Sequence, residues 1–181
     1  MDRKSFIKNS SIALALALVP GCVRGDNEPK VEQAATELEP KIVRKDEGDI
    51  LNVIGDLQTH KIAGADTDNQ IVEWVNEVSP GVGIPPHIHT KEDEIFRVLK
   101  GQVELTVGDT TTVLKEGDVA FAPKNVMHAW KIVGSENASM STSAFPAGVE
   151  HMFSELNDLP PGPPDFEKVA AICEKYGIRF V

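Results

Sequence analysis

The sequence predicts an all-β fold in which antiparallel strands form a sandwich or a barrel. From Ile50 onwards the chain consists of short runs of β-branched and aromatic residues, separated by glycine, proline, aspartate and asparagine. This is the pattern of strands joined by turns. The connections between the runs are also too short for the crossovers that parallel strands need. Both observations favour a compact antiparallel core.

Seven segments have the composition of a strand. Short strands at this spacing, with turn residues between them, are typical of antiparallel barrels and sandwiches. In chain order they are ILNVIG from residue 50, QIVEWVNEV from 70, EIFRVLKG from 94, QVELTVG from 102, TTTVLKEG from 110, DVAFAP from 118 and VMHAWKIVG from 126.

One helix is expected near the C-terminus. The proline-rich stretch LPPGPP, residues 159–164, interrupts the chain, and an amphipathic segment follows from Asp165 to Tyr176. Gly177 comes next, and glycine commonly ends a helix. The apolar stripe of this segment includes Cys173, which we expect to be a buried, unreactive thiol. The helix should pack on the outside of the β core.

Two of the five histidines stand one residue apart in GVGIPPHIHTKEDEIFRVLKG, residues 81–101. Because side chains alternate between the two faces of a strand, His87 and His89 project to the same side and can bind one ion together. The polar segment TKED then lets the chain turn, so that Glu94 on the next strand adds a carboxylate oxygen. The stretch therefore predicts three metal ligands on one hairpin.

His128, much further along the chain, is a fourth candidate ligand. The spacing of glycines and ligands over residues 81–101 resembles the first motif of the cupin superfamily at every fixed position. Residues 117–132 resemble the second motif, with Asn125 in place of the middle glycine and Ile132 in place of the last asparagine. Asparagine tolerates the left-handed backbone better than most residues, so we expect the turn to be kept.

The resemblance is to single-domain cupins of the quercetin-dioxygenase-like type and extends over about residues 42 to 180. It implies a cupin-type antiparallel β-barrel, or jelly roll, over residues 50–146, with a C-terminal helical extension over residues 147–181 packed outside. It also implies one divalent transition metal inside the barrel. Imidazole and carboxylate ligands suit Fe, Mn, Ni, Co, Cu or Zn and do not distinguish among them. The implied ligands are His87, His89, Glu94 and His128.

The strands that carry the ligands also predict the wall of a substrate pocket. Alternation from Glu94 and from His128 places Phe96, Val98, Trp130 and Ile132 on the ligand face, although each of them would equally serve as barrel core. An apolar wall suits a planar or aromatic molecule better than a phosphorylated sugar, which would need lysine and arginine. His60 and His151 match no ligand position and are expected at the surface.

These residues lead to one principal hypothesis and two alternatives. The principal hypothesis is a metal-dependent dioxygenase that acts on a small phenolic or other planar organic substrate, with Glu94 as ligand and catalytic proton acceptor. The first alternative is a non-catalytic protein that binds a small molecule through the metal, because cupins include both kinds. A sugar isomerase or epimerase is the second alternative, and the lack of basic residues on the wall disfavours it.

The first residues of the chain have the layout of a signal peptide. Basic residues precede an uncharged apolar run from Ile12 to Val19, and VPGC, which ends at Cys22, resembles the lipobox of bacterial lipoproteins. As a helix the apolar run would be about 12 Å long, too short for a hydrocarbon core of about 30 Å. We therefore expect a signal peptide over residues 1–21, a lipidated Cys22 and a flexible tether over residues 22–49. An ordinary secretory signal with an incidental Cys22 is the alternative.

Charge and location narrow the range of partners. The formal net charge is −10, so a nucleic-acid backbone would be repelled and no nucleic-acid partner is expected. We expect an exported bacterial lipoprotein, anchored in a membrane and facing the periplasm or the cell surface. Its expected partners are a small-molecule substrate and, through the lipid, a membrane, while a homodimer is left open.

Overall fold

The computed structural model describes residues 37–181 of the chain. The expected signal peptide, Cys22 and most of the expected tether lie outside the described residues. The described part contains two α-helices, one short 3-10 turn and eleven strands. They are β1 (Asp49–Val53), β2 (Asp56–Ile62), η1 (Gly64–Asp66), β3 (Val72–Val78), β4 (Gly83–His89), β5 (Asp93–Lys100), β6 (Gln102–Val107), β7 (Thr110–Lys115), β8 (Val119–Ala122), β9 (His128–Ile132), β10 (Ala138–Phe145), α1 (Val149–Asn157), α2 (Phe166–Tyr176) and β11 (Ile178–Phe180).

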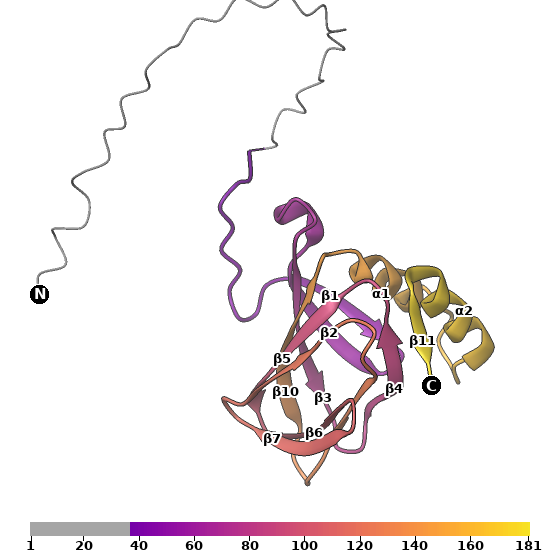
Figure 1. Cartoon of the computed structure of the whole chain (residues 1–181). Coiled ribbons are helices and arrows are strands. Elements are labelled where there is room, and N and C mark those ends of the chain that lie inside the picture. The colour runs from indigo at the N-terminus through magenta and orange to yellow at the C-terminus, as the bar shows by residue number, and fades with distance from the viewer. Residues whose placement is uncertain (1–36) are drawn as a thin grey trace, which may run out of the picture. The chain divides into compact units, whose positions relative to one another are not determined.

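The strands form two antiparallel sheets that face each other. One sheet has the strand order β1-β2-β3-β10-β5-β8, and the other has the order β11-β4-β9-β6-β7. The sheets curve around a common interior, and α1 and α2 lie together outside it (Figure 1). The predicted all-β barrel with an outer helical segment is confirmed, and each of the seven predicted segments contains a strand.

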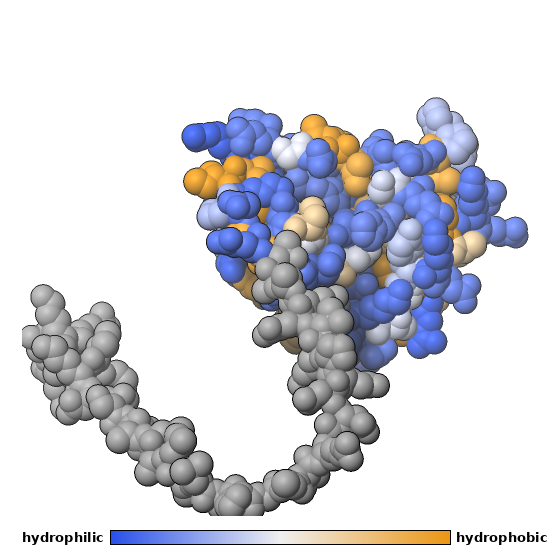
Figure 2. Space-filling model, turned by 90° about the horizontal axis from the view of Figure 1, so that it is seen from above, coloured by the Kyte–Doolittle hydropathy of each residue, from blue (hydrophilic) through white to orange (hydrophobic). Residues whose placement is uncertain are grey.

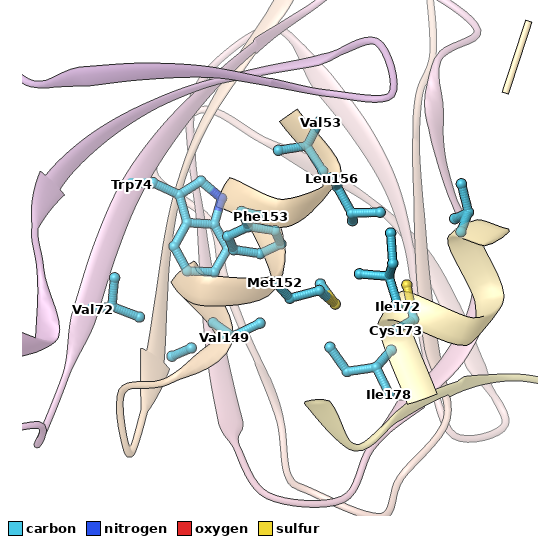
Figure 3. Packing of buried hydrophobic residues seen from close by; sticks show 12 residues of the cluster. Val53, Val72, Trp74, Val149, Met152, Phe153, Leu156, Ile172, Cys173 and Ile178 are labelled. Atoms are coloured by element: carbon cyan, nitrogen blue, oxygen red, sulfur yellow. The ribbon is translucent and has the colours of Figure 1, made fainter. Parts of the chain in front are cut away.

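Two apolar clusters hold the barrel and the helices together. The first fills the space between the sheets and includes Val98, Val103, Leu105, Ile132 and Met140. Strand β10 shows the pattern that builds it, because every second residue is buried. The second cluster lies where the helices meet the barrel, and side chains of α1 approach Trp74 there (Figure 3). The outer surface seen in Figure 2 is mostly hydrophilic, with separate small apolar patches.

Helix α2 has the boundaries that the sequence predicts. Asp165 is the N-cap, and its Oδ1 accepts hydrogen bonds from the amides of Glu167 at 3.1 Å and Lys168 at 3.2 Å. Gly177 ends the helix with a φ of 91°, which a residue with a side chain rarely adopts. Cys173 is buried, and burial raises the pKa of its thiol to about 11. The thiol is therefore protonated at neutral pH, in agreement with its predicted core role.

The predicted helical extension over residues 147–181 contains a short strand in addition to its helices. After Gly177 the chain forms β11, which pairs with β4 so that Ile178 lies opposite His89 and Phe180 opposite His87. The amide and hydroxyl of Thr90 both donate to the carbonyl oxygen of Gly177, at 2.9 and 2.7 Å. Strand β11 covers what would be an exposed edge of β4 with unpaired backbone groups, so it belongs to the barrel sheet.

The other end of the barrel also differs from the prediction. Residues 41–47 fall in the predicted tether, yet Nζ of Lys61 donates to the carbonyl oxygens of Arg44 at 3.2 Å and Lys45 at 2.8 Å. Lys41 forms an ion pair with Asp66. These contacts attach the segment to the loop and strand beside it, so any free tether ends before residue 41. Between residues 37 and 181, no helix is long and apolar enough to cross a membrane.

Candidate metal centre

Three strands bring the four predicted ligands together inside the barrel. His87 and His89 project from β4, and His87 lies directly opposite His128 of β9 in the antiparallel register. Glu94 comes from β5, which belongs to the facing sheet. One donor atom of each residue lies within 4.8 Å of the other three, and all four residues are buried. The sequence alternation that placed two histidines on one face therefore also directs them towards a carboxylate across the barrel.

The turn before β9 keeps its shape with asparagine in place of glycine. Asn125 has a φ of 65°, which is the left-handed conformation that asparagine tolerates. Its amide donates to the carbonyl oxygen of His89 at 2.7 Å, so this turn is tied to the end of β4. The expectation that the turn survives is confirmed, and the contact joins the two segments that carry the histidines.

The contacts of the Nδ1 atoms determine which nitrogen of each histidine faces the centre. Nδ1 of His87 donates to the carbonyl oxygen of Pro85 at 2.8 Å, and Nδ1 of His128 donates to that of Val126 at 3.1 Å. A carbonyl only accepts, so in both rings the proton sits on Nδ1. In a neutral ring with this tautomer, Nε2 carries no proton and can coordinate a cation. His89 differs, because its Nδ1 lies 3.4 Å from Oε2 of Glu92, in an ionic contact rather than a well-formed hydrogen bond.

The electrostatics of the centre favour a neutral His87 and an ionised Glu94. Burial is the largest of the effects that lower the pKa of His87 to about 4, and the neighbouring His128 and His89 act in the same direction. Burial alone would raise the pKa of Glu94, but the surrounding histidines, His89 first, hold it well below its usual range. Burial also opposes protonation of His89, but Glu94 and then Glu92 outweigh it and raise its pKa. Glu94 is therefore an anion at neutral pH and His87 a neutral ligand.

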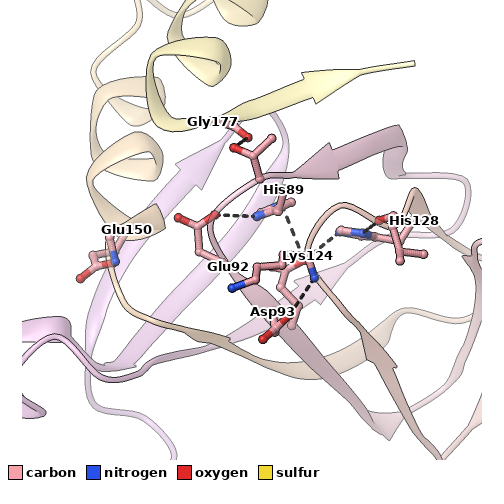
Figure 4. A network of polar contacts seen from close by, with 11 residues as sticks. His89, Glu92, Asp93, Lys124, His128, Glu150 and Gly177 are labelled. Atoms are coloured by element: carbon pink, nitrogen blue, oxygen red, sulfur yellow. Dashed lines mark hydrogen bonds and ion pairs between the residues drawn. The ribbon is translucent and has the colours of Figure 1, made fainter.

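The buried polar atoms of the centre fit a divalent cation. Nε2 of His128 lies 2.9 Å from Oε2 of Glu94, but the geometry is not that of a hydrogen bond, so this buried nitrogen has no hydrogen-bond partner among the described residues. Nε2 of His89 lies 3.7 Å from the same oxygen. Figure 4 shows the contact between His89 and Glu92 and, close by, the hydrogen bond from the backbone amide of Lys124 to Asp93. Converging nitrogen and carboxylate donors without a competing partner are what a transition metal requires.

The centre opens into a cavity of about 560 Å³. Its wall contains the ligands His87, His89 and Glu94, and it extends from them to the inner faces of α1 and α2. Most of the lining is apolar. The residues that contribute to the wall include Phe96, Trp130, Ile84, Met152, Phe153 and Phe180.

Two of the four predicted pocket residues do not reach this cavity. All four belong to the apolar cluster between the sheets, but only Phe96 and Trp130 also line the cavity. All four point inwards, as alternation predicts, but Val98 and Ile132 lie two residues further along their strands. There Met140 pairs with Val98 and Val103 pairs with Ile132, and these side chains fill the barrel. The assignment of Val98 and Ile132 to the pocket wall is therefore corrected.

Comparison with known proteins adds the family context. Residues 74–143 match the family model described as Cupin domain. The barrel has the cupin fold. This cupin barrel resembles the structure of KdgF from Halomonas sp., with a TM-score of 0.54 and 18% identity over 62% of this chain and 99% of that one. It also resembles a predicted oxalate decarboxylase from Thermotoga maritima, with a TM-score of 0.54 and 20% identity over 59% of this chain and 99% of that one.

Curated relatives match the cupin barrel only in part. Quercetin 2,3-dioxygenase of Aspergillus japonicus is 34% identical over 83 residues, which cover 43% of this chain and 23% of that protein. A probable germin-like protein of Arabidopsis thaliana is 31% identical over 96 residues, which cover 49% of this chain and 44% of that protein. An uncharacterized protein of Aquifex aeolicus is 46% identical over 46 residues, which cover 25% of this chain and 38% of that protein. The matched segments therefore span less than half of each relative.

The two remaining histidines lie outside the metal centre of the cupin barrel. His151 is exposed, as expected. His60 is half-buried, which corrects the surface expectation: its ring stacks on Trp74 at 6.0 Å between centroids, and its Nε2 lies 3.0 Å from Oε1 of Gln58. Sequence reasoning missed several buried polar residues altogether, namely Glu92, Asp56, Gln58 and Asn76. Nothing in the TKED sequence indicates that the side chain of Glu92 will be buried.

Proposed function

We propose that this protein is a metal-dependent dioxygenase that acts on a small phenolic or other planar organic substrate. The observation that carries the proposal is the position of a buried four-residue donor set at the wall of a largely apolar cavity. The names of two partial relatives, Quercetin 2,3-dioxygenase and Oxidoreductase OpS7 of Beauveria bassiana, support the same class of reaction.

The donor set would hold the metal and leave room for a ligand. Four protein donors leave open positions on a six-coordinate ion, and openness is what separates a catalytic centre from a structural one. A bound ion would supply Lewis acidity and, if redox-active, the electron transfer that dioxygen chemistry requires. Zinc and redox-active metals suit the same ligands, so elemental analysis is needed to identify the native ion.

The residues of the chain would prepare the substrate. Phe96 and Trp130 on the cavity wall would contact a planar ring and keep water away from it. Glu94 is ionised at neutral pH, since the histidines lower its pKa, and one of its oxygens would be free to take the proton of a phenolic hydroxyl. Loss of this proton to Glu94 would leave an electron-rich ring, which is the form that reacts with dioxygen.

Oxygen consumption tests the proposal. The chain would be loaded separately with Fe(II), Mn(II), Co(II), Ni(II) and Cu(II) and mixed with catechols and flavonols under labelled dioxygen. We expect uptake with at least one metal and two labelled oxygen atoms in the product. His128→Ala should abolish both, and His151→Ala, which alters an exposed histidine, should not.

The opposite outcome would favour the non-catalytic alternative. If the chain binds one metal per molecule, consumes no dioxygen with any of the five ions and returns the phenolic compound unchanged from a tight complex, the dioxygenase proposal fails. Binding through the metal would then be the function. Turnover of a sugar in the absence of dioxygen would instead support an isomerase.

For location, we propose export and anchoring through Cys22. The support is the sequence of the first residues alone: a basic start, an apolar run that ends at Val19 and the VPGC stretch. The substrate would then be met outside the cytoplasm, at a membrane surface.

A further inference from the structure

A group of polar side chains interrupts the apolar wall of the cavity at a distance from the metal centre. Asp56 and Gln58 on β2, Asn76 on β3 and Thr142 on β10 all line the cavity. Each of the four is at most 2% exposed. The same cavity is lined by His87, His89 and Glu94, so one ligand has access to both regions.

Asp56 is the centre of this group. Nε2 of Gln58 donates to its Oδ2 at 2.8 Å, and Nδ2 of Asn76 lies 2.7 Å from Oδ1 and 2.6 Å from Oδ2. Thr142 donates in turn to Oδ1 of Asn76 at 3.4 Å. The two amides therefore fix the carboxyl group, but a carboxylate has about four lone-pair sites and they occupy only some of them.

The carboxyl group of Asp56 is buried without a cationic partner. The ion pairs within residues 37–181 do not include it. Burial raises its pKa, which the hydrogen bonds from Gln58 and Asn76 only partly offset. A buried carboxyl group of this kind disfavours folding unless something compensates it.

The fold does not need polar residues in this layer of the sheet. Asn76 pairs with Met140, and Met140 pairs with Val98, so the same inward-facing layer continues with apolar side chains. Apolar residues would pack there as they do on the neighbouring strands. The polar group is therefore better explained by what the cavity holds than by the packing of the barrel.

The register places the polar group well away from the ligands. Glu94 pairs with Ala144, whereas Asn76 pairs with Met140, four residues along the same strand. At a rise of roughly 3.3 Å per residue, the separation along the strands is about 13 Å. A molecule that reaches from the metal centre to Asp56 must therefore be elongated, with polar groups at its two ends.

We propose that Asp56 determines substrate specificity by accepting a hydrogen bond from a hydroxyl group at the end of the substrate remote from the metal centre. Gln58 and Asn76 position the carboxyl group for this contact. The inference deepens the proposed function: the substrate class becomes an elongated, largely apolar phenol with metal-binding oxygens at one end and a hydroxyl donor at the other.

Two matched probes test the role of Asp56 without turnover. Biphenyl-3,4-diol and biphenyl-3,4,4′-triol share a catechol end and differ only in the remote hydroxyl. Their affinities would be measured by calorimetry on the chain loaded with one zinc ion, so that no oxygenation takes place. We expect the triol to bind about 10-fold more tightly than the diol, since one well-formed buried hydrogen bond contributes roughly that much.

The substitution Asp56→Asn should reduce this preference, since it replaces one of the two acceptor oxygens of the carboxyl group with a donor. Asp109→Asn, in an exposed turn, is the matched control and should keep the preference. Equal binding of the two probes to the natural chain, or an undiminished preference in Asp56→Asn, would overturn the proposal. If Asp56→Asn fails to fold, the comparison on the natural chain still decides.

The outcome is separate from that of the dioxygenase proposal. A preference for the triol without any oxygen uptake would support the role of Asp56 and refute the oxygenation. Zinc bound in a one-to-one ratio with no binding of either probe would overturn the role of Asp56 while the metal centre itself stands.

Discussion

Nδ1 of His89 lies 3.4 Å from a carboxylate oxygen of Glu92, and both side chains are buried. The equivalent nitrogens of His87 and His128 face backbone carbonyl oxygens instead. His89 is thus the one histidine of the three with an acidic partner behind it. Such a carboxylate keeps the proton on Nδ1, turns Nε2 towards the metal and makes it a stronger donor.

Replacement of this carboxylate should weaken metal binding without removing a ligand. We expect Glu92→Gln to lower the affinity for the bound metal by about 10- to 100-fold. Competition with a chelator of known affinity measures the effect, and the exposed Glu116→Gln is the control. An unchanged affinity in Glu92→Gln would show that Glu92 only fills space beside His89.

The low pKa of His87 predicts acid sensitivity of the metal-free protein. The folded state keeps the ring neutral down to about pH 4, while the unfolded chain takes up a proton below 6.5. Stability that comes from the neutral ring is therefore complete above pH 6.5 and is lost as the pH falls towards 4. The shift corresponds to about 3 kcal/mol.

Urea unfolding at a series of pH values measures this contribution. Between pH 6.5 and 4 the unfolding free energy of the metal-free natural chain should fall relative to that of His87→Gln. The exposed His151→Gln should follow the natural chain. Parallel curves for the natural chain and His87→Gln would mean that burial does not hold this imidazole neutral.

Ile132 and Phe96 should respond differently to small changes, because only Phe96 lines the cavity. We expect Ile132→Val to cost about 1 kcal/mol of stability through a small packing defect and to leave affinity for a catechol probe unchanged. Phe96→Leu should also weaken probe binding, since the ring is lost from the wall. Thermal unfolding and calorimetry on the same samples separate the two effects. A change in probe affinity with Ile132→Val would show instead that Ile132 does line the cavity.

Lipidation at Cys22 predicts a hydrophobic mature protein. In a bacterial host the natural chain should partition into a detergent phase and carry the extra mass of a lipid at its new N-terminus. Cys22→Ser should remain in the aqueous phase. Recovery of the natural chain from the aqueous phase, cut at a site other than before residue 22, would instead indicate an ordinary secretory signal.

Three of the four ligands could be predicted because they lie on one hairpin, whereas His128 was implied only by the resemblance to the second cupin motif. Alternation on β4 places His87 and His89 on one face whatever the rest of the chain does. The same rule assigned Val98 and Ile132 to the correct face, but it carries no information about depth in the barrel. The position of Val98 and Ile132 along the barrel depends on Met140 and Val103, which come to lie beside them only through strand pairing.

Three strands could not be predicted from the sequence, because their residues lack the usual strand pattern or because they form only through pairing with distant segments. Strands β2, DLQTHKI, and β10, ASMSTSAF, are rich in polar or small residues and lack the β-branched runs that mark a strand. Strand β11 has only three residues and forms because it completes the edge of β4, a pairing between distant parts of the chain. The burial of Glu92 and Asp56 likewise depends on which elements surround them.

Metal content tests the central claim most directly, because the account rests on four side chains that bind one ion. Elemental analysis of the chain purified without added metal, and again after loading, should give one transition-metal ion per chain. His87→Ala and His128→Ala should each reduce this to a small fraction, while His151→Ala should not. A natural chain that retains no metal after loading, or a His87→Ala His128→Ala double variant that retains a full ion, would contradict the account.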